Sequence, residues 1–207
     1  MQSPDLTAHW NQVYATRRPD QVSWTQDVPR TSLDFLASFG LRPDAHVLDV
    51  GGGDSRLVDF LLDAGFTRLS VLDISGQALA RARARLGERA SAVTWIERDV
   101  LDFEPTEAVD VWHDRATFHF LTDGSAVTRY LALARQATRP GARLAMGTFS
   151  TDGPTSCSGL PVRQYDEQTL TDALAVGFTK IRCLTEDHLT PFQTRQNFLF
   201  CSFRRTA

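Results

Sequence analysis

The stretch that decides the fold is Val47–Ser55, with the sequence VLDVGGGDS, in a chain of 207 residues. It completes a short apolar run, Ala45–Val50, and passes directly into three glycines. A short apolar run that ends in glycine is typical of a buried strand, and glycines past a strand let the backbone turn sharply and let a ligand approach it closely. Because Ser55–Ala64 (SRLVDFLLDA) then has the spacing of a helix, the stretch predicts a strand, a ligand-binding turn and a helix.

Strands and helices alternate along most of the chain. Strands are predicted over 45–50, 68–73, 92–97, 109–113 and 142–149, and helices over 6–14, 31–39, 55–64, 76–86 and 126–138. This alternation predicts βαβ units and a parallel sheet with helices on both faces. Two last strand-like runs, 178–186 and 197–204, are joined by a segment too short for a crossover helix, so they should pair antiparallel. We therefore predict an α/β, Rossmann-like doubly wound sheet, mostly parallel and closed by a C-terminal hairpin.

The length favours one domain, since domains have about 100–200 residues. Within this single domain, 1–207, we expect an N-terminal part, 1–44, whose two helices act as a lid, and a ligand-binding core at 45–150. The third part, 151–207, contains the C-terminal hairpin. It opens with 151–163, the longest irregular stretch, which we predict to be a loop that closes over an acceptor.

Charge and cysteine content exclude several classes of protein. With 22 basic and 25 acidic residues, the net charge of −3 argues against a protein built mainly to bind nucleic acid. The sequence has no apolar run of about 18 residues, so no membrane span is predicted. Three cysteines without CxxC spacing favour a reducing cytoplasm and no disulfide. Arg81, Arg85 and Arg89 repeat every four residues, and we interpret them as a solvated helix face, with RNA contact as the weaker alternative.

Asp49 stands two residues before the first glycine of the turn. The pattern GxGxxG of dinucleotide-binding proteins fails here, because its third glycine position is Arg56. A carboxylate at the turn would repel a pyrophosphate, but it suits a ligand that carries positive charge. S-adenosylmethionine (SAM) carries an ammonium and a sulfonium, so Asp49 favours SAM over a nicotinamide dinucleotide as the cofactor.

Two further acids follow the next two strands. Asp73 lies 20 residues after Gly53, where a Rossmann-type fold places the carboxylate that accepts hydrogen bonds from ribose hydroxyls. Asp99 follows the third strand, where it can accept from an adenine amino group. Each acid alone is more often a cap or a solvated loop residue. Three acids at the carboxyl ends of successive parallel strands nevertheless predict one nucleotide-binding site.

The chain resembles the class I SAM-dependent methyltransferases in three segments. LDVGGGDS (48–55) is similar to their glycine motif, VLDIS (71–75) to their ribose-binding strand and ERDVLDF (97–103) to their adenine-side motif. The resemblance implies a seven-stranded sheet with a reversed last strand, and SAM as cofactor with S-adenosylhomocysteine (SAH) as product. The residues expected to contact the cofactor are Trp24, Asp49, Gly51, Gly53, Ser55, Asp73, Ile74, Asp99 and Val100.

Within that family, the chain is most similar to a subgroup that contains the eukaryotic lysine methyltransferases of elongation factor 1A. The matches are Trp10, Tyr14, Trp24, Ser55 in place of a third glycine, and DRATF at 114–118, which is similar to a D-K-G-T motif followed by Leu or Phe. Arg115-Ala116 stand where that motif has Lys-Gly, and the loop 148–165 is unmatched. The resemblance therefore implies the cofactor and leaves the acceptor open.

Methyl transfer needs groups that position the acceptor nucleophile, and often one that removes its proton. Such groups should follow the fourth strand, where His113, Asp114 and His119 are found. These three residues are our catalytic candidates. Asp114 or His113 would serve as the base, His113 because its charge changes near neutral pH. The alternatives are a helix cap for Asp114 and a core position for His119.

Other polar residues on the same rim are expected to bind the acceptor: Arg115, Cys157, Arg163, Tyr165 and His188. Arg163 would hold a carboxylate, and such a role favours a small acid as acceptor. A metal site is not expected, because His113 and His119 are six residues apart rather than the four that align ligands on one helix face.

The sequence thus predicts a cytoplasmic SAM-dependent methyltransferase that acts by in-line displacement. A domain with no docking appendage and a loop rich in Cys, Gly and Pro favours a small-molecule acceptor, whereas the DRATF motif favours a protein lysine. A non-catalytic SAM-binding protein is the alternative from another class, because no catalytic tetrapeptide such as N-P-P-Y follows the fourth strand. The failed GxGxxG pattern and the terminal hairpin argue against a dehydrogenase.

Overall fold

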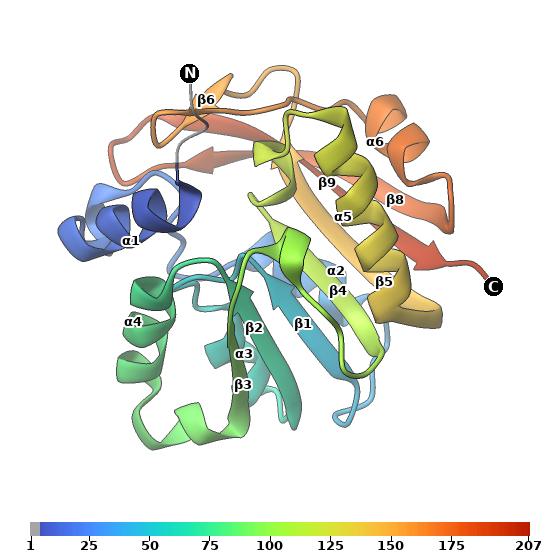
Figure 1. Ribbon diagram of the computed structural model, residues 1–207, viewed down its shortest axis with the longest axis horizontal. Coiled ribbons are helices and arrows are strands. Elements are labelled where there is room, and N and C mark those ends of the chain that lie inside the picture. Colours follow the sequence, from blue (N-terminus) through green and yellow to red (C-terminus); the bar gives the residue numbers. More distant parts are fainter. Residues whose placement is uncertain (1–4) are drawn as a thin grey trace.

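Seven strands form one sheet in the computed structural model, which describes residues 5–207 (Figure 1). In their order across the sheet, the strands are β3 Val93–Glu97, β2 Arg68–Asp73, β1 His46–Val50, β4 Val109–Arg115, β5 Thr138–Phe149, β9 Arg195–Arg205 and β8 Phe178–Leu189. Neighbours from β3 to β5 pair parallel, and β9 pairs antiparallel with both β5 and β8. The predicted mostly parallel sheet with a reversed last strand is confirmed.

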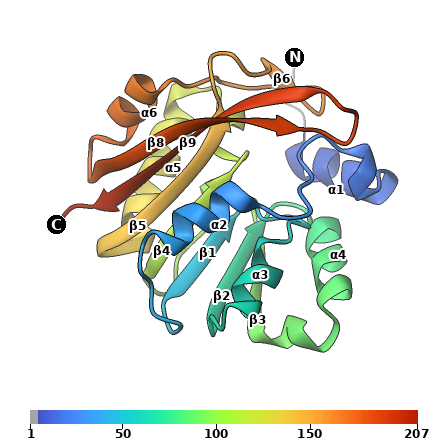
Figure 2. The ribbon, with the colours of Figure 1, turned by 180° about the vertical axis from the view of Figure 1, so that it is seen from behind.

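Helices cover both faces of this sheet (Figures 1 and 2). α5 Gly124–Ala137 and α6 Glu167–Leu174 lie on one face, and α2 Arg30–Ala37 and α3 Leu57–Asp63 lie on the other. The remaining helices are α1 Leu6–Thr16 and α4 Gly76–Leu86, with short 3₁₀ turns at Pro19–Gln21, Gly87–Ala92, Val100–Asp102 and Phe118–Phe120. Across residues 5–207, no helix is long and apolar enough to cross a membrane.

Alternate residues of the central strands join two separate apolar layers, because successive side chains of a strand point to opposite faces. Leu48 and Trp112 pack in the layer under α5 and α6, whereas Val47 and Val111 pack in the layer under α2 and α3. Burial on both faces explains why these strands are nearly continuous apolar runs in the sequence. The packed sheet in turn provides a rigid base for the loops at the carboxyl ends of its strands.

Two parts of the C-terminal third were not predicted. Helix α6 is the crossover between β5 and β8, and it begins at Asp166, whose side chain accepts from the Thr169 N–H at 2.7 Å. The segment 151–163, predicted to be irregular, contains a small hairpin of β6 Ser156–Cys157 and β7 Leu160–Pro161. Strands of two residues show too few positions for a periodic pattern to be recognised.

The expectation of no disulfide is wrong. Cys183 on β8 and Cys201 on β9 are bonded to each other across the hairpin, with Cα atoms 4.1 Å apart, and Cys157 is free and buried. The two bonded cysteines face each other directly in the strand register, which sequence spacing does not reveal. The cysteine content therefore no longer favours a reducing compartment.

The predicted solvated face is only partly solvated, since Arg81 and Arg85 on α4 are half-buried, whereas Arg89, in the 3₁₀ turn that follows, is exposed. Arg85 donates to Asp59 at 3.1 and 2.7 Å, and Arg89 donates to Asp63 at 2.7 Å, both on α3. Arg81 donates to a backbone carbonyl at the end of α1 at 2.6 Å. The stripe therefore fastens α4 to α3 and to α1.

Candidate active site

The glycine turn between β1 and α3 has a backbone that glycine adopts most readily. Gly51 and Gly53 have φ of 63° and 52°. A Cβ at Gly51 would overlap the Thr117 side chain, and a Cβ at Gly53 would lie 2.7 Å from the Tyr14 hydroxyl. The absence of side chains at these two glycines therefore lets Thr117 and Tyr14, from two distant segments, pack directly against the turn.

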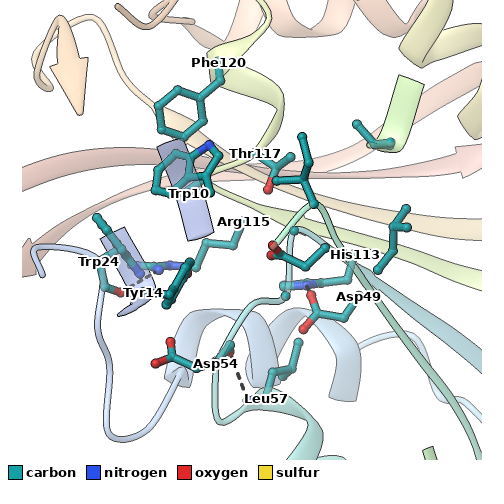
Figure 3. Close-up of a pocket in the computed structure, with 18 of the residues that line it drawn as sticks. Trp10, Tyr14, Trp24, Asp49, Asp54, Leu57, His113, Arg115, Thr117 and Phe120 are labelled. Atoms are coloured by element: carbon teal, nitrogen blue, oxygen red, sulfur yellow. Dashed lines mark hydrogen bonds and ion pairs between the residues drawn. The ribbon is translucent and has the colours of Figure 1, made fainter. Parts of the chain in front are cut away.

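A cavity of about 270 Å³ opens beside this turn, at the carboxyl ends of β1 to β4, where open α/β sheets bind ligands (Figure 3). The predicted cofactor residues that line it are Trp24, Asp49, Gly51, Ser55, Asp73, Ile74, Asp99 and Val100. The other one, Gly53, shapes the turn without lining the cavity. Residues of α1 and of the segment 19–29 also line the cavity, so part of the N-terminal region predicted to be a lid lies against the site.

The predicted acids meet at this cavity from three different strands. Asp73 is 7% exposed, and its Oδ1 accepts from a backbone N–H two residues further on at 2.7 Å. Burial, helped by the charges of Asp49 and Asp54, raises the pKa of Asp73 from 3.8 to about 7. Asp99 lines the cavity and also caps the 3₁₀ turn that follows it, accepting from a backbone N–H at 2.8 Å. Asp54 lines the cavity as well, and the sequence pattern did not single it out.

His113 lies between Asp49 and Ser32 in the cavity wall (Figure 3). Its Nδ1 is 2.7 Å from Asp49 Oδ1, and its Nε2 is 2.9 Å from Ser32 Oγ. All three residues are at most 5% exposed. With Asp49 ionised, Nδ1–H donates to the carboxylate and Nε2 accepts from the serine hydroxyl. Ser32 was not predictable from the sequence, because it is 81 residues away from His113 and belongs to no local motif.

The positions of Asp114 and His119 do not fit the predicted catalytic roles. Asp114 is fully buried, and its Oδ1 accepts from two backbone N–H groups of the following turn at 3.0 and 3.2 Å. Its Oδ2 accepts from the Tyr130 hydroxyl at 2.5 Å, so both oxygens are engaged in holding the structure. His119 accepts from the Phe149 N–H at 3.2 Å, and burial lowers its pKa to about 3. The structural alternatives, a cap and a core histidine, describe these two residues.

Four aromatic residues pack together over the cavity (Figure 3). Ring centroids are 5.7 Å apart for Trp10 and Trp24, 5.2 Å for Trp10 and Phe120, and 6.1 Å for Tyr14 and Trp24, all in edge-to-face geometry. Such pairs stabilise packing beyond the area that they bury. Because all four rings also line the cavity, packing and ligand contact are compatible roles.

Two of the predicted acceptor residues line the cavity, Arg115 and Cys157. The other three do not: Arg163 is exposed, and Tyr165 is fully buried. His188 donates through Nε2 to a backbone carbonyl of the segment 19–29 at 2.7 Å, so it holds the chain that crosses the cavity. Among residues 5–207, no group of three His, Cys, Asp or Glu side chains is arranged to hold a metal ion.

Comparisons with known proteins agree with this architecture. Residues 48–144 match the family model of a methyltransferase domain, and no curated protein matches the chain. The N-methyltransferase NodS from Bradyrhizobium japonicum WM9, solved with SAH, is 18% identical with a TM-score of 0.75, covering 98% of this chain and 100% of that chain.

Two further solved structures are similar over nearly the whole chain. The 1,6-didemethyltoxoflavin-N1-methyltransferase from Burkholderia thailandensis, with 1,6-didemethyltoxoflavin and SAH bound, is 21% identical with a TM-score of 0.73, covering 100% of this chain and 92% of that chain. A protein from work on the conversion of a disulfide bond into a thioacetal group during echinomycin biosynthesis is 21% identical with a TM-score of 0.76, covering 97% and 93%. Residues 48–144 thus match a methyltransferase domain, and the chain as a whole has the fold of these solved SAM-dependent methyltransferases.

Proposed function

We propose that this protein is a SAM-dependent methyltransferase with a small-molecule acceptor. The observation that carries the proposal is the convergence of Asp49, Asp73 and Asp99, from three successive strands, on one cavity beside a glycine turn. The resemblance of the sequence to class I enzymes and the match to a methyltransferase domain support the same assignment.

The donor set of the cavity fits this cofactor. The carboxylates of Asp73 and Asp99 are suited to accept from ribose hydroxyls and an adenine amino group, and the aromatic faces of Trp10 and Trp24 attract a cation. Gly51 keeps the turn free of a side chain. When bound, SAM supplies a methyl group on a cationic sulfur, and the sulfur–carbon bond breaks as the bond from the acceptor forms.

His113 is the residue that we assign to proton removal. An acceptor proton would reach His113 Nε2 directly or through the Ser32 hydroxyl, which would pass its own proton on. The resulting imidazolium would donate from Nδ1 to the Asp49 carboxylate, 2.7 Å away. The fixed hydrogen bonds on both ring nitrogens would hold the imidazole in one orientation.

A small acceptor is favoured over a protein lysine for a structural reason. The lysine alternative rests on the DRATF motif, yet Asp114 and Thr117 of that motif shape the turn after β4 and the contact with Gly51. Asp114 and Thr117 therefore bear on the fold of the cofactor site, and they do not indicate a lysine acceptor. Aromatic rings from α1 and from residues 19–29 further enclose the cavity.

Calorimetry with SAH tests the cofactor assignment, and the absence of binding at concentrations of about 100 μM would refute it. Transfer of labelled methyl from SAM into a bacterial lysate, separated by size, tests the acceptor class. Label only in the protein fraction would contradict a small-molecule acceptor.

Variants of two histidines separate an enzyme from a non-catalytic SAM-binding protein, once an acceptor is found. His113→Gln should keep SAH affinity and lose about 100-fold or more in turnover, the usual contribution of a general base. His46→Gln is the matched control, because His46 also bonds a serine, at 2.8 Å from Ser70, but lies outside the cavity. Full turnover in His113→Gln would exclude the proton-removal role.

A further inference from the structure

Arg115, the last residue of β4, is a buried cation with most of its donors free. Its Nη1 donates to the Trp24 carbonyl at 3.0 Å, while Nε and Nη2 are shielded from solvent and have no hydrogen-bond partner in the described part of the chain. The guanidinium carbon lies 4.8 Å from the centre of the Phe198 ring. Because a buried charge with unmade hydrogen bonds is costly, such a group usually has a partner.

Residues 5–207 do not supply that partner. Burial lowers the pKa of Arg115 to about 10, and Glu186, Cys157 and Asp49 only partly offset this effect. None of these three groups forms a hydrogen bond with the guanidinium. The side chain is nevertheless directed into the cavity, where it extends toward Trp24 (Figure 3). A ligand in the cavity is the partner that these free donors indicate.

The free atoms also indicate the chemistry of that ligand. Nε and Nη2 lie on one edge of the planar guanidinium, and their two N–H groups are parallel. This edge matches the two oxygens of a carboxylate, which accepts both hydrogen bonds at once. A neutral carbonyl or hydroxyl would satisfy only one of them and would leave the charge unpaired.

The place of Arg115 in the sheet assigns this anion to the acceptor. The cofactor acids lie at the ends of β1, β2 and β3 on one side of β4, whereas Phe198 is on β9 on the other side and packs in one apolar cluster with Cys157. We infer that the methyl acceptor is a small carboxylic acid, anchored by Arg115 through the Nε–Nη2 edge. This inference rests on the proposed function, and it moves the carboxylate-binding role from Arg163 to Arg115.

Matched acid and amide probes test the inference on the full chain saturated with SAH. The pairs are benzoate with benzamide, phenylacetate with phenylacetamide, and hexanoate with hexanamide, titrated by ligand-observed NMR. In the wild type, at least one acid should bind about tenfold or more tightly than its amide, as expected of a charge-assisted pair. Equal binding within every pair, including undetectable binding, would overturn the inference.

Substitutions then test whether Arg115 causes the tighter binding of acids than of amides. Arg115→Gln should abolish it, and Arg163→Gln, which removes an exposed arginine outside the cavity, should leave it unchanged. Arg115→Lys keeps the charge without the fork and should weaken the preference, which provides the same test if the glutamine variant does not fold. Preference retained in both Arg115 variants would refute the assignment.

The Nε–Nη2 edge of Arg115 could bind the carboxylate of the acceptor or the carboxylate of SAH. Measuring the affinity for SAH distinguishes these two possibilities. Arg115→Gln should leave SAH affinity within about twofold, and a tenfold loss would assign Arg115 to the cofactor and overturn the acceptor role. The probes are also titrated without SAH. An acid preference in a wild type that binds no SAH would refute the proposed methyltransferase function, while an intact SAH affinity without acid preference would refute only the present inference.

Discussion

Asp73 is expected to destabilise the folded protein above neutral pH, because its carboxylate is buried in the wall of the cavity. Its pKa is raised from 3.8 to about 7, mainly by burial. The folded state therefore holds this proton more tightly than the unfolded state. As the pH rises from about 4 to about 7, the free energy of unfolding falls, and above about 7 the effect of Asp73 is constant.

The magnitude follows from about 1.4 kcal/mol per pKa unit. The shifted titration of Asp73 lowers the free energy of unfolding by about 1.5 kcal/mol at pH 5, where only the unfolded state has lost the proton, and by about 4 kcal/mol at pH 8. Asp73→Asn removes this effect but also disturbs the hydrogen bonds from the Ser75 and Gly53 N–H groups, at a cost of about 1–3 kcal/mol that does not vary with pH. The stability difference between variant and wild type should therefore become about 2–3 kcal/mol more favourable to the variant from pH 5 to pH 8.

Urea denaturation of both proteins at pH 5, 6, 7 and 8 measures this difference. Glu104→Gln, which removes an exposed carboxylate, is the control for the loss of one negative charge. Calorimetry with SAH gives the functional side, since Asp73→Asn should lose affinity if Asp73 accepts from the ribose hydroxyls. A stability difference that is constant between pH 5 and pH 8 would refute the reasoning about Asp73.

Two further substitutions test how the site is held. Gly51→Ala should lower the free energy of unfolding by about 2–4 kcal/mol and abolish SAH binding, because a left-handed residue is strained and its Cβ would overlap Thr117. The control Gly40→Ala, with a similar φ of 60° and open space around it, should lower this free energy by only about 1 kcal/mol. Equal losses of the two variants in urea denaturation would contradict the role of the overlap. Tyr130→Phe removes the hydroxyl that donates to the buried Asp114 carboxylate and should lower the free energy of unfolding at pH 7 by about 2–3 kcal/mol, whereas a loss below about 0.5 kcal/mol would show that this bond contributes little.

Local pattern was sufficient to predict most of the scaffold. The apolar run before Gly51, the alternation of strands and helices and the short final connector predicted the doubly wound sheet and its antiparallel β9, because each of these signals lies within a window of a few residues. The acids Asp49, Asp73 and Asp99 were predictable as a group for a related reason. Each ends or follows a parallel strand, and parallel strands bring these ends to one edge of the sheet.

Tertiary structure alone decided which polar groups are free and which are taken. Asp114 and His113 are adjacent in sequence, yet one has both oxygens engaged by the turn and by Tyr130, and the other faces the cavity. Strand geometry explains the contrast, since adjacent side chains point to opposite faces of the sheet.

The side chains that these groups contact come from distant parts of the chain. Ser32 reaches His113 from α2, Cys201 meets Cys183 through the register of two strands, and Arg115 finds only one partner for its donors. The cofactor side of the site was predictable from the sequence, because backbone topology brings the carboxyl ends of the parallel strands together. The side that binds the methyl acceptor was not predictable, because it depends on which hydrogen-bonding groups remain unpaired after the layers have packed.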